Sequence, residues 1–122
     1  MTANEILSTG FSLAGRDFET FSDKQIALTW LNVSLAEALP YENQVRGKKK
    51  KPLLTYAPRA ENLGQNIDFE EHICAVALPY SIAGYLYDDR ENSYMSGIFR
   101  NRFVRDLSSL AKAVESPITE VV

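Results

Sequence analysis

The sequence predicts a mainly α-helical protein: a small bundle of about four helices, with a short β/loop insertion between the second and third helices and an extended C-terminal tail. Four stretches carry apolar residues at the three- and four-residue spacing of helices, and a segment with three prolines separates the second stretch from the third. The 122 residues, 45% hydrophobic and 24% charged, fit one domain, because two domains of about 60 residues would each have a marginal core.

The expected boundaries follow from where the helical spacing stops. A single helical domain is expected over residues 1–115, with an irregular, lysine-rich β/loop insertion at 40–67. Residues 116–122 are expected to form an extended tail. The first residues lack the basic patch and apolar core of a signal peptide, so a cytosolic protein is expected.

The first two helices differ in how much of their surface is apolar. The first is expected over residues 3–14, where Gly10 lowers its stability by roughly 1 kcal/mol. The second is expected to start at a capping box of Ser22 and Gln25 and to end at about Leu39, before a proline. Its apolar residues cover far more than the roughly 100° stripe of a surface helix. We therefore expect it to be covered on two sides.

The insertion predicts a short strand. Residues 52–56 are expected to be extended and to pair with residues 66–69, or residues 66–69 lead into the next helix. Asp68 is expected to cap that helix. Glu70 and Glu71 then lie in its first turn, where the helix dipole favours negative charge.

The third helix is expected in a stretch without charge. Residues 73–87 contain no Asp, Glu, Lys or Arg, but they fall short of the ~20 residues that cross a bilayer. We therefore expect a buried helix and no membrane partner. Pro79 is expected to kink or divide the helix near Ala75, where a carbonyl loses its partner.

The last helix is expected from Ser93 to Val114, with apolar residues on one face and Ile98, Arg102 and Arg105 on the outer side. Ser116 and Pro117 then end the helix, and residues 118–122 are β-prone.

The residue types needed for catalysis or metal binding are scarce. There is one cysteine, Cys74, and one histidine, His72, too few for a zinc site of about four ligands. Two positions apart on a helix, they point about 200° away from one another and cannot form a nucleophile–base pair. No enzyme activity, catalytic residue, metal or cofactor is expected.

The second and third helices together predict contacts between copies. Both are apolar on more than one side, and a chain of this length forms only one layer around a core. We therefore expect a homo-oligomer whose subunit interface contains Trp30, Leu31, Leu35, Leu78, Ile82 and Leu86. Ile118 and Val121 of the tail are expected to join this interface, because an extended segment can dock as an added strand on a neighbouring subunit.

The order of these elements resembles a known family. The residues that carry the likeness are Ala27–Glu37 (ALTWLNVSLAE), Phe69–Ile73 (FEEHI), Leu78–Asp89 (LPYSIAGYLYDD), and Phe99, Phe103 and Leu107 of the last helix. Over residues 3–113 the pattern resembles the head-to-tail connector, or adaptor, ring proteins of tailed bacteriophages.

This resemblance implies a structural virion protein found in the neck, and in the host cytoplasm during assembly. In that family, usually twelve mainly α-helical subunits form a ring beneath the portal protein. The ring extends the DNA channel and provides the platform for a tail or stopper protein. The family has no catalytic residues to transfer to this chain.

A cationic segment departs from the family's pattern. Five positive charges fall within residues 46–51 of a chain whose net charge is −3, and such a run is usually a solvated loop. Inside a ring it is expected either to contact the phosphates of packaged double-stranded DNA without sequence preference or to meet an acidic surface of the portal. The residues concerned are Arg46, Lys48, Lys49, Lys50 and Lys51.

Two other functions stay open. One is a small helical DNA-binding or regulatory dimer, although no expected helix presents a clear cationic recognition face. The other is an enzyme whose site forms between subunits from Tyr, Arg and Glu side chains, which would require a closed apolar pocket with perturbed titrating groups.

Overall fold

A computed structural model describes residues 1–113, and its fold is the predicted small, mainly α-helical bundle of four helices. Helix α1 spans Ala3–Leu13 and α2 spans Lys24–Lys48. A π-helix, Ile73–Ala77, continues into α3, Leu78–Asp89, and α4 spans Ser93–Ala113. Within residues 1–113 there is no β-strand.

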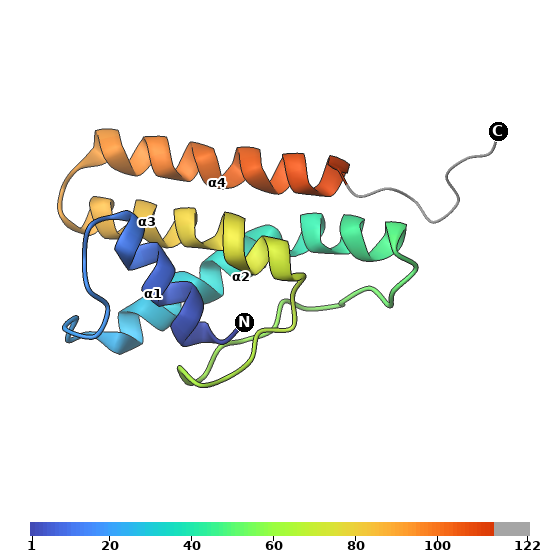
Figure 1. Cartoon of the computed structure of the whole chain (residues 1–122), viewed down its shortest axis with the longest axis horizontal. Helices are drawn as coiled ribbons and strands as arrows, with labels where there is room; N and C mark the ends of the chain where they lie inside the picture. The colour runs from blue at the N-terminus through green and yellow to red at the C-terminus, as the bar shows by residue number, and fades with distance from the viewer. Residues whose placement is uncertain (114–122) are drawn as a thin grey trace.

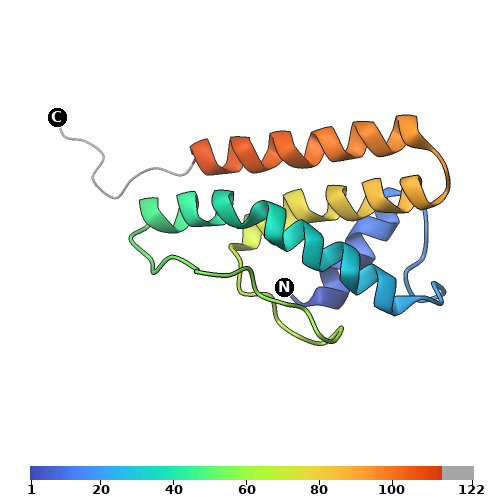
Figure 2. The same ribbon diagram turned by 180° about the vertical axis from the view of Figure 1, so that it is seen from behind.

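Helix α3 is the centre of the bundle. It packs against α1, α2 and α4, with α4 along one side and α1 on the other (Figure 1). Seen from behind, α2 crosses the bundle and ends near the end of α4 (Figure 2). This arrangement places the C-terminal ends of α2 and α4 at one end of the molecule, and the α3–α4 turn at the other.

Helix α1 matches its predicted range and has a close contact with α3. The Thr2 Oγ1 accepts from the Glu5 backbone N–H at 3.2 Å, and the Thr2 N–H donates to Glu5 Oε1 at 2.9 Å, which is a capping box that the sequence reading missed. A Cβ atom placed on Gly10 would lie 2.6 Å from the Cβ of Ile82 and 2.9 Å from the carbonyl oxygen of Pro79. Glycine at this position therefore lets the two helices approach closely.

The predicted limits of α2 are wrong at both ends. The cap is Asp23, whose Oδ1 accepts from the Ile26 N–H at 3.0 Å, one residue after the expected Ser22. The helix also continues through Pro40 to Lys48. Proline removes the hydrogen bond to the carbonyl of Ala36, but Ala36 and Pro40 are both exposed, so water can satisfy that carbonyl.

Residues 49–70, which connect α2 to the third helical segment, run along α2 and are called the strap below. The strap contains no strand, so the prediction of a strand at 52–56 is wrong. Two asparagine side chains of α2 each form hydrogen bonds with the backbone N–H and the carbonyl of one strap residue. These are the backbone groups that a neighbouring strand would otherwise bind. Asn43 accepts from the Leu54 N–H at 2.9 Å and donates to its carbonyl at 2.9 Å. Asn32 does the same for Ala60, at 2.7 and 3.0 Å.

Residues 66–69 also pair differently from the prediction. Asn66 forms an isolated antiparallel bridge with Thr2, and the Ile67 N–H donates to the carbonyl of Met1 at 2.9 Å. The predicted cap at Asp68 is wrong too, because helical structure starts at Glu71 and the Asp68 carbonyl accepts from Arg46 instead.

Pro79 does not divide the helix, which runs from Glu71 to Asp89 without interruption. The helix instead changes type near the predicted position, because it is a π-helix over Ile73–Ala77 and α-helical from Leu78 onward. Proline then occupies the first turn of α3, where a missing N–H is tolerated. Helix α4 begins at Ser93 as predicted, and Asn92 Oδ1 accepts from the Met95 N–H at 3.1 Å.

The predicted subunit-interface residues are inside the single chain, which corrects the prediction. Trp30 is 9% exposed, and the other five residues of the set on α2 and α3 are fully buried: Leu31, Leu35, Leu78, Ile82 and Leu86. The physical reason is the central position of α3, which uses its several apolar sides against three helices of its own chain. Ile118 and Val121, and the predicted tail at 116–122, lie outside the described residues.

No helix within residues 1–113 combines the length and the apolar character needed to span a bilayer.

Candidate functional site

The cationic segment lies at the end of the bundle where α2 finishes. Arg46 and Lys48 belong to the last turn of α2, and Lys49 caps it. This corrects the expectation that all five cations lie on a loop. Positive side chains are favoured at a helix C-terminus because they complement the helix dipole. Lys50 then reverses the chain with a positive φ of 57°.

Arg46 is buried and therefore unavailable to DNA or to the portal, which corrects its assignment as a contact residue. Its Nε donates to Glu42 Oε2 at 2.6 Å, and one terminal nitrogen donates to the Asp68 carbonyl at 2.9 Å. Glu42 is fully buried, and its other oxygen accepts from the Glu70 N–H at 2.9 Å. Although burial disfavours the charged guanidinium, its hydrogen bond to Glu42 and the charges of Glu42 and Asp68 raise the pKa of Arg46. This network attaches the strap to α2.

The four lysines keep a share of exposed surface. The ammonium groups of Lys49 and Lys51 pair with the two oxygens of Glu70, at 3.0 and 2.9 Å. Lys48 donates to the carbonyl of Ala111 at 2.8 Å, near the end of α4. Within the described part of the chain, Lys50 has no ion pair. An exposed ion pair contributes about 0–1 kcal/mol to stability. The lysine ammonium groups can therefore leave Glu70 and bind the anionic groups of a partner instead.

Glu70 predicts a pH dependence of stability. Hydrogen bonds from Lys51 and then Lys49 lower the pKa of Glu70 below its usual value, against the opposing effect of burial. A lowered pKa in the folded state means that the carboxylate stabilises the fold above the unfolded pKa, about 4.3, and that this contribution is lost as pH falls through the folded pKa. We expect Glu70→Gln to lower the free energy of unfolding at pH 7 and to have little effect at pH 2, as measured by urea unfolding at both values.

The neighbouring exposed carboxylate provides the control for that measurement. Glu71 is 70% exposed and lies 3.7 Å from the N-terminal ammonium group. Glu71→Gln should change stability less than Glu70→Gln at pH 7. Equal effects of the two substitutions would contradict the assigned role of the lysine pairs.

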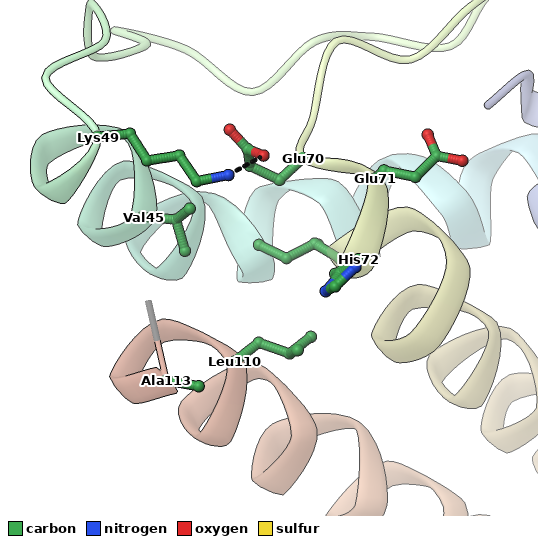
Figure 3. A pocket seen from close by; sticks show the side chains of 8 residues that line it. Val45, Lys49, Glu70, Glu71, His72, Leu110 and Ala113 are labelled. Atoms are coloured by element: carbon green, nitrogen blue, oxygen red, sulfur yellow. Dashed lines mark hydrogen bonds and ion pairs between the residues drawn. The ribbon is translucent and has the colours of Figure 1, made fainter. Parts of the chain in front are cut away.

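A hollow of about 550 Å³ adjoins the cationic segment. Figure 3 shows that it lies between the end of α2, the start of the third helical segment and the end of α4. Its apolar floor has charged groups at the rim, where Lys49 pairs with Glu70. The lining residues are Val45, Lys49, Glu70, Glu71, His72, Ile73, Leu110 and Ala113.

The groups around this hollow do not form a catalytic constellation. His72 is exposed at the rim, whereas Cys74 is fully buried and its Sγ lies 3.8 Å from the carbonyl of Phe69. Burial raises the pKa of Cys74 to about 12, so its thiol stays protonated and unreactive. Among residues 1–113, no three His, Cys, Asp or Glu side chains are grouped as metal ligands.

Two further surfaces, which the sequence reading did not identify as sites, expose apolar side chains. On α4, Ile98 is 45% exposed and lines a groove of about 460 Å³ together with Arg102 and Arg105. Val104 is 48% exposed but lies about 120° away from Ile98 around the helix and does not line this groove. On α2, Ile26 and Val33 are 38% and 44% exposed. The one feature of the sequence that pointed to these surfaces was Ile98, an apolar residue that the helical spacing places on the outer side of the last helix, with Arg102 and Arg105.

Two of the three arginines of α4, Arg100 and Arg102, are held by contacts within the chain. Arg100 donates to the Ser81 hydroxyl at 2.5 Å and to Glu37 at 2.6 Å. Arg102 donates to Asp106 at 3.0 Å and stacks on Tyr80. These contacts link α4 to α2 and α3. Arg105 is exposed and has no ion pair among residues 1–113, but a single arginine is not the row of cations that a recognition helix presents to DNA.

The described surfaces are thus a cationic end with an adjoining hollow, and exposed apolar patches on α2 and α4. No protein-family model, curated protein or solved structure matches the chain.

Proposed function

We propose that the chain is a head-to-tail connector subunit of a tailed bacteriophage, a structural protein of the virion neck without enzyme activity. In this proposal, identical subunits form a ring of about twelve copies under the portal. The ring joins the capsid to a tail or stopper protein and extends the channel through which double-stranded DNA passes.

The observation that carries the proposal is the pair of unlike apolar patches on separate helices. A ring of identical subunits uses a heterologous interface, in which one surface of each copy binds a different surface of the next. The chain exposes Ile26 and Val33 on α2, and Ile98 beside the groove on α4. Both patches lie outside the core, so a subunit with its own complete core can still join its neighbours. The order of helices is also the one that the family resemblance implies.

The test is the mass of the assembly with and without a portal. We expect the purified chain to add a ring of subunits to the portal protein encoded by the same phage, as measured by native mass spectrometry and seen as an added layer by electron microscopy. Ile98→Asp should reduce the number of bound copies, whereas Glu61→Gln, at an exposed strap position, should not. A chain that stays separate from the portal and binds a specific DNA sequence as a dimer would contradict the proposal.

The lysines of the cationic segment provide a second, electrostatic prediction. Replacing Lys48, Lys49, Lys50 and Lys51 by serine is expected to weaken docking to the portal or retention of DNA. The deficit should be largest at low salt, because screening and counterion effects reduce the contribution of these charges as salt rises. Binding measured from about 50 to 500 mM salt should therefore give a shallower slope for the variant.

Arg16 is the matched control, because it is an exposed cation in the α1–α2 connection. Arg16→Ser should leave docking and its salt dependence unchanged when compared with the single substitution Lys50→Ser. If the quadruple variant docks and retains DNA as the native chain does at every salt concentration, the cationic segment has no role in either contact.

A further inference from the structure

The hollow beside the cationic segment opens where α4 ends. Its apolar floor includes Val45 from α2, Ile73 from the π-helix and Leu110 from α4. Ala113, the last residue of α4, is part of the lining (Figure 3). The segment of residues 114–122 therefore begins at the hollow itself.

We propose that this hollow is the docking site of the chain's own C-terminal segment, with Ile118 and Val121 against the apolar floor. This inference does not depend on the connector function, since it concerns contacts within one chain.

The length and sequence of the segment suit this site. Nine residues extend to at most about 30 Å, and Ser116–Pro117 is a dipeptide that favours a turn. The proposal places a turn at this dipeptide, so that residues 118–122 return to the hollow. A hollow of about 550 Å³ is within the ~300–1,000 Å³ of sites that enclose a small ligand, so it has room for a short run of side chains.

The charges are complementary as well. The segment has two acidic side chains, Glu115 and Glu120, and no basic one. The end of the bundle that it meets carries four lysines, of which Lys49 is on the rim of the hollow and Lys48 reaches the Ala111 carbonyl of the last turn of α4. The five cations of residues 46–51 face four carboxylates at this end, Glu42, Asp68, Glu70 and Glu71. The balance is a net charge of +1, which attracts the acidic segment.

A spin label on the segment tests the proposal in the full chain. Thr119→Cys supplies a reactive thiol between the two proposed contact residues, and the native Cys74 stays unmodified because it is fully buried. We expect the label to abolish the methyl NMR signals of Leu110, Ile73 and Val45. The signal of Leu13, at the far end of α1, should keep its intensity.

Two control experiments test whether the C-terminal segment of the same molecule occupies the hollow, and whether its apolar side chains make the contact. Adding Ile118→Asp to the labelled chain should restore the lost signals, whereas adding Glu120→Gln should restore them less, because it removes one charge and no apolar contact. When a spin-labelled chain is mixed with an isotope-enriched, unlabelled chain, the signals should persist, because the contact is within one molecule. Signals that persist in the labelled chain itself, or that are lost only in the mixture, as from a neighbouring copy, would overturn the proposal.

Discussion

Replacing Glu42 by alanine is expected to lower the free energy of unfolding by about 3–5 kcal/mol, the usual cost of removing one partner of a buried ion pair. Glu42 is fully buried, and it accepts from Arg46 at 2.6 Å and from the Glu70 N–H at 2.9 Å. Without the carboxylate, the Nε of Arg46 and the backbone N–H of Glu70 both lose their acceptor, and the guanidinium keeps only its bonds to Pro52 and Asp68. Urea unfolding followed by circular dichroism measures the change.

Two controls separate the buried charge from a general effect of the substitution. Glu37, also on α2, pairs with Arg100 at 2.6 Å but is 39% exposed, so Glu37→Ala should cost only about 1 kcal/mol or less. The double variant Glu42→Leu, Arg46→Leu should recover much of the lost stability, because no unpaired charge remains inside. If Glu42→Ala is as mild as Glu37→Ala, the ion pair does not anchor the strap.

Gly10→Ala is the second large effect that we expect. Alanine usually stabilises a helix by about 1 kcal/mol relative to glycine, but here the added Cβ would lie 2.6 Å from the Ile82 Cβ and 2.9 Å from the Pro79 carbonyl oxygen. Neither atom is the flexible end of a side chain, so α1 and α3 must move apart. Overpacking of this kind costs about 1–3 kcal/mol, measurable as a lower Tm.

Gly97 is the matched control, because it is also in a helix and a Cβ there would meet nothing within 4 Å. Gly97→Ala should therefore raise stability by up to about 1 kcal/mol. The two substitutions are chemically identical and should act in opposite directions. The same sign for both would show that helix propensity, and not the contact with α3, decides the outcome at Gly10.

Local patterns predicted the helices well and their ends less well. The apolar spacing located α1 and α4 to within a residue at the described ends, and Pro79 marked the change from π-helix to α-helix at the start of α3. The predicted end of α2 before Pro40 was wrong. Proline usually ends a helix because the carbonyl four residues earlier loses its hydrogen-bond donor. Here the carbonyl faces water, and the burial of Glu42 and Val45 in the next turn favours continuing the helix.

The sites were harder to predict because they depend on partners far apart in the sequence. The apolar sides of α3 were interpreted as an interface with a neighbouring copy. They pack instead against three helices of the same chain, and the number of helices around a given helix cannot be counted from the sequence. The cationic segment was found from its charges alone. Its division into a buried Arg46 and exposed lysines depends on Glu42, Asp68 and Glu70. Asp68 and Glu70 are 19 to 22 positions away from the cations that they bind.

The strap has a practical consequence. Asn32 and Asn43 bind it through backbone groups of Ala60 and Leu54, and backbone recognition is indifferent to the side chains in between. Tyr56, 83% exposed, lies between the two anchored residues. A fluorophore or a short epitope could be grafted there to report on assembly, while the bundle that carries it keeps its packing.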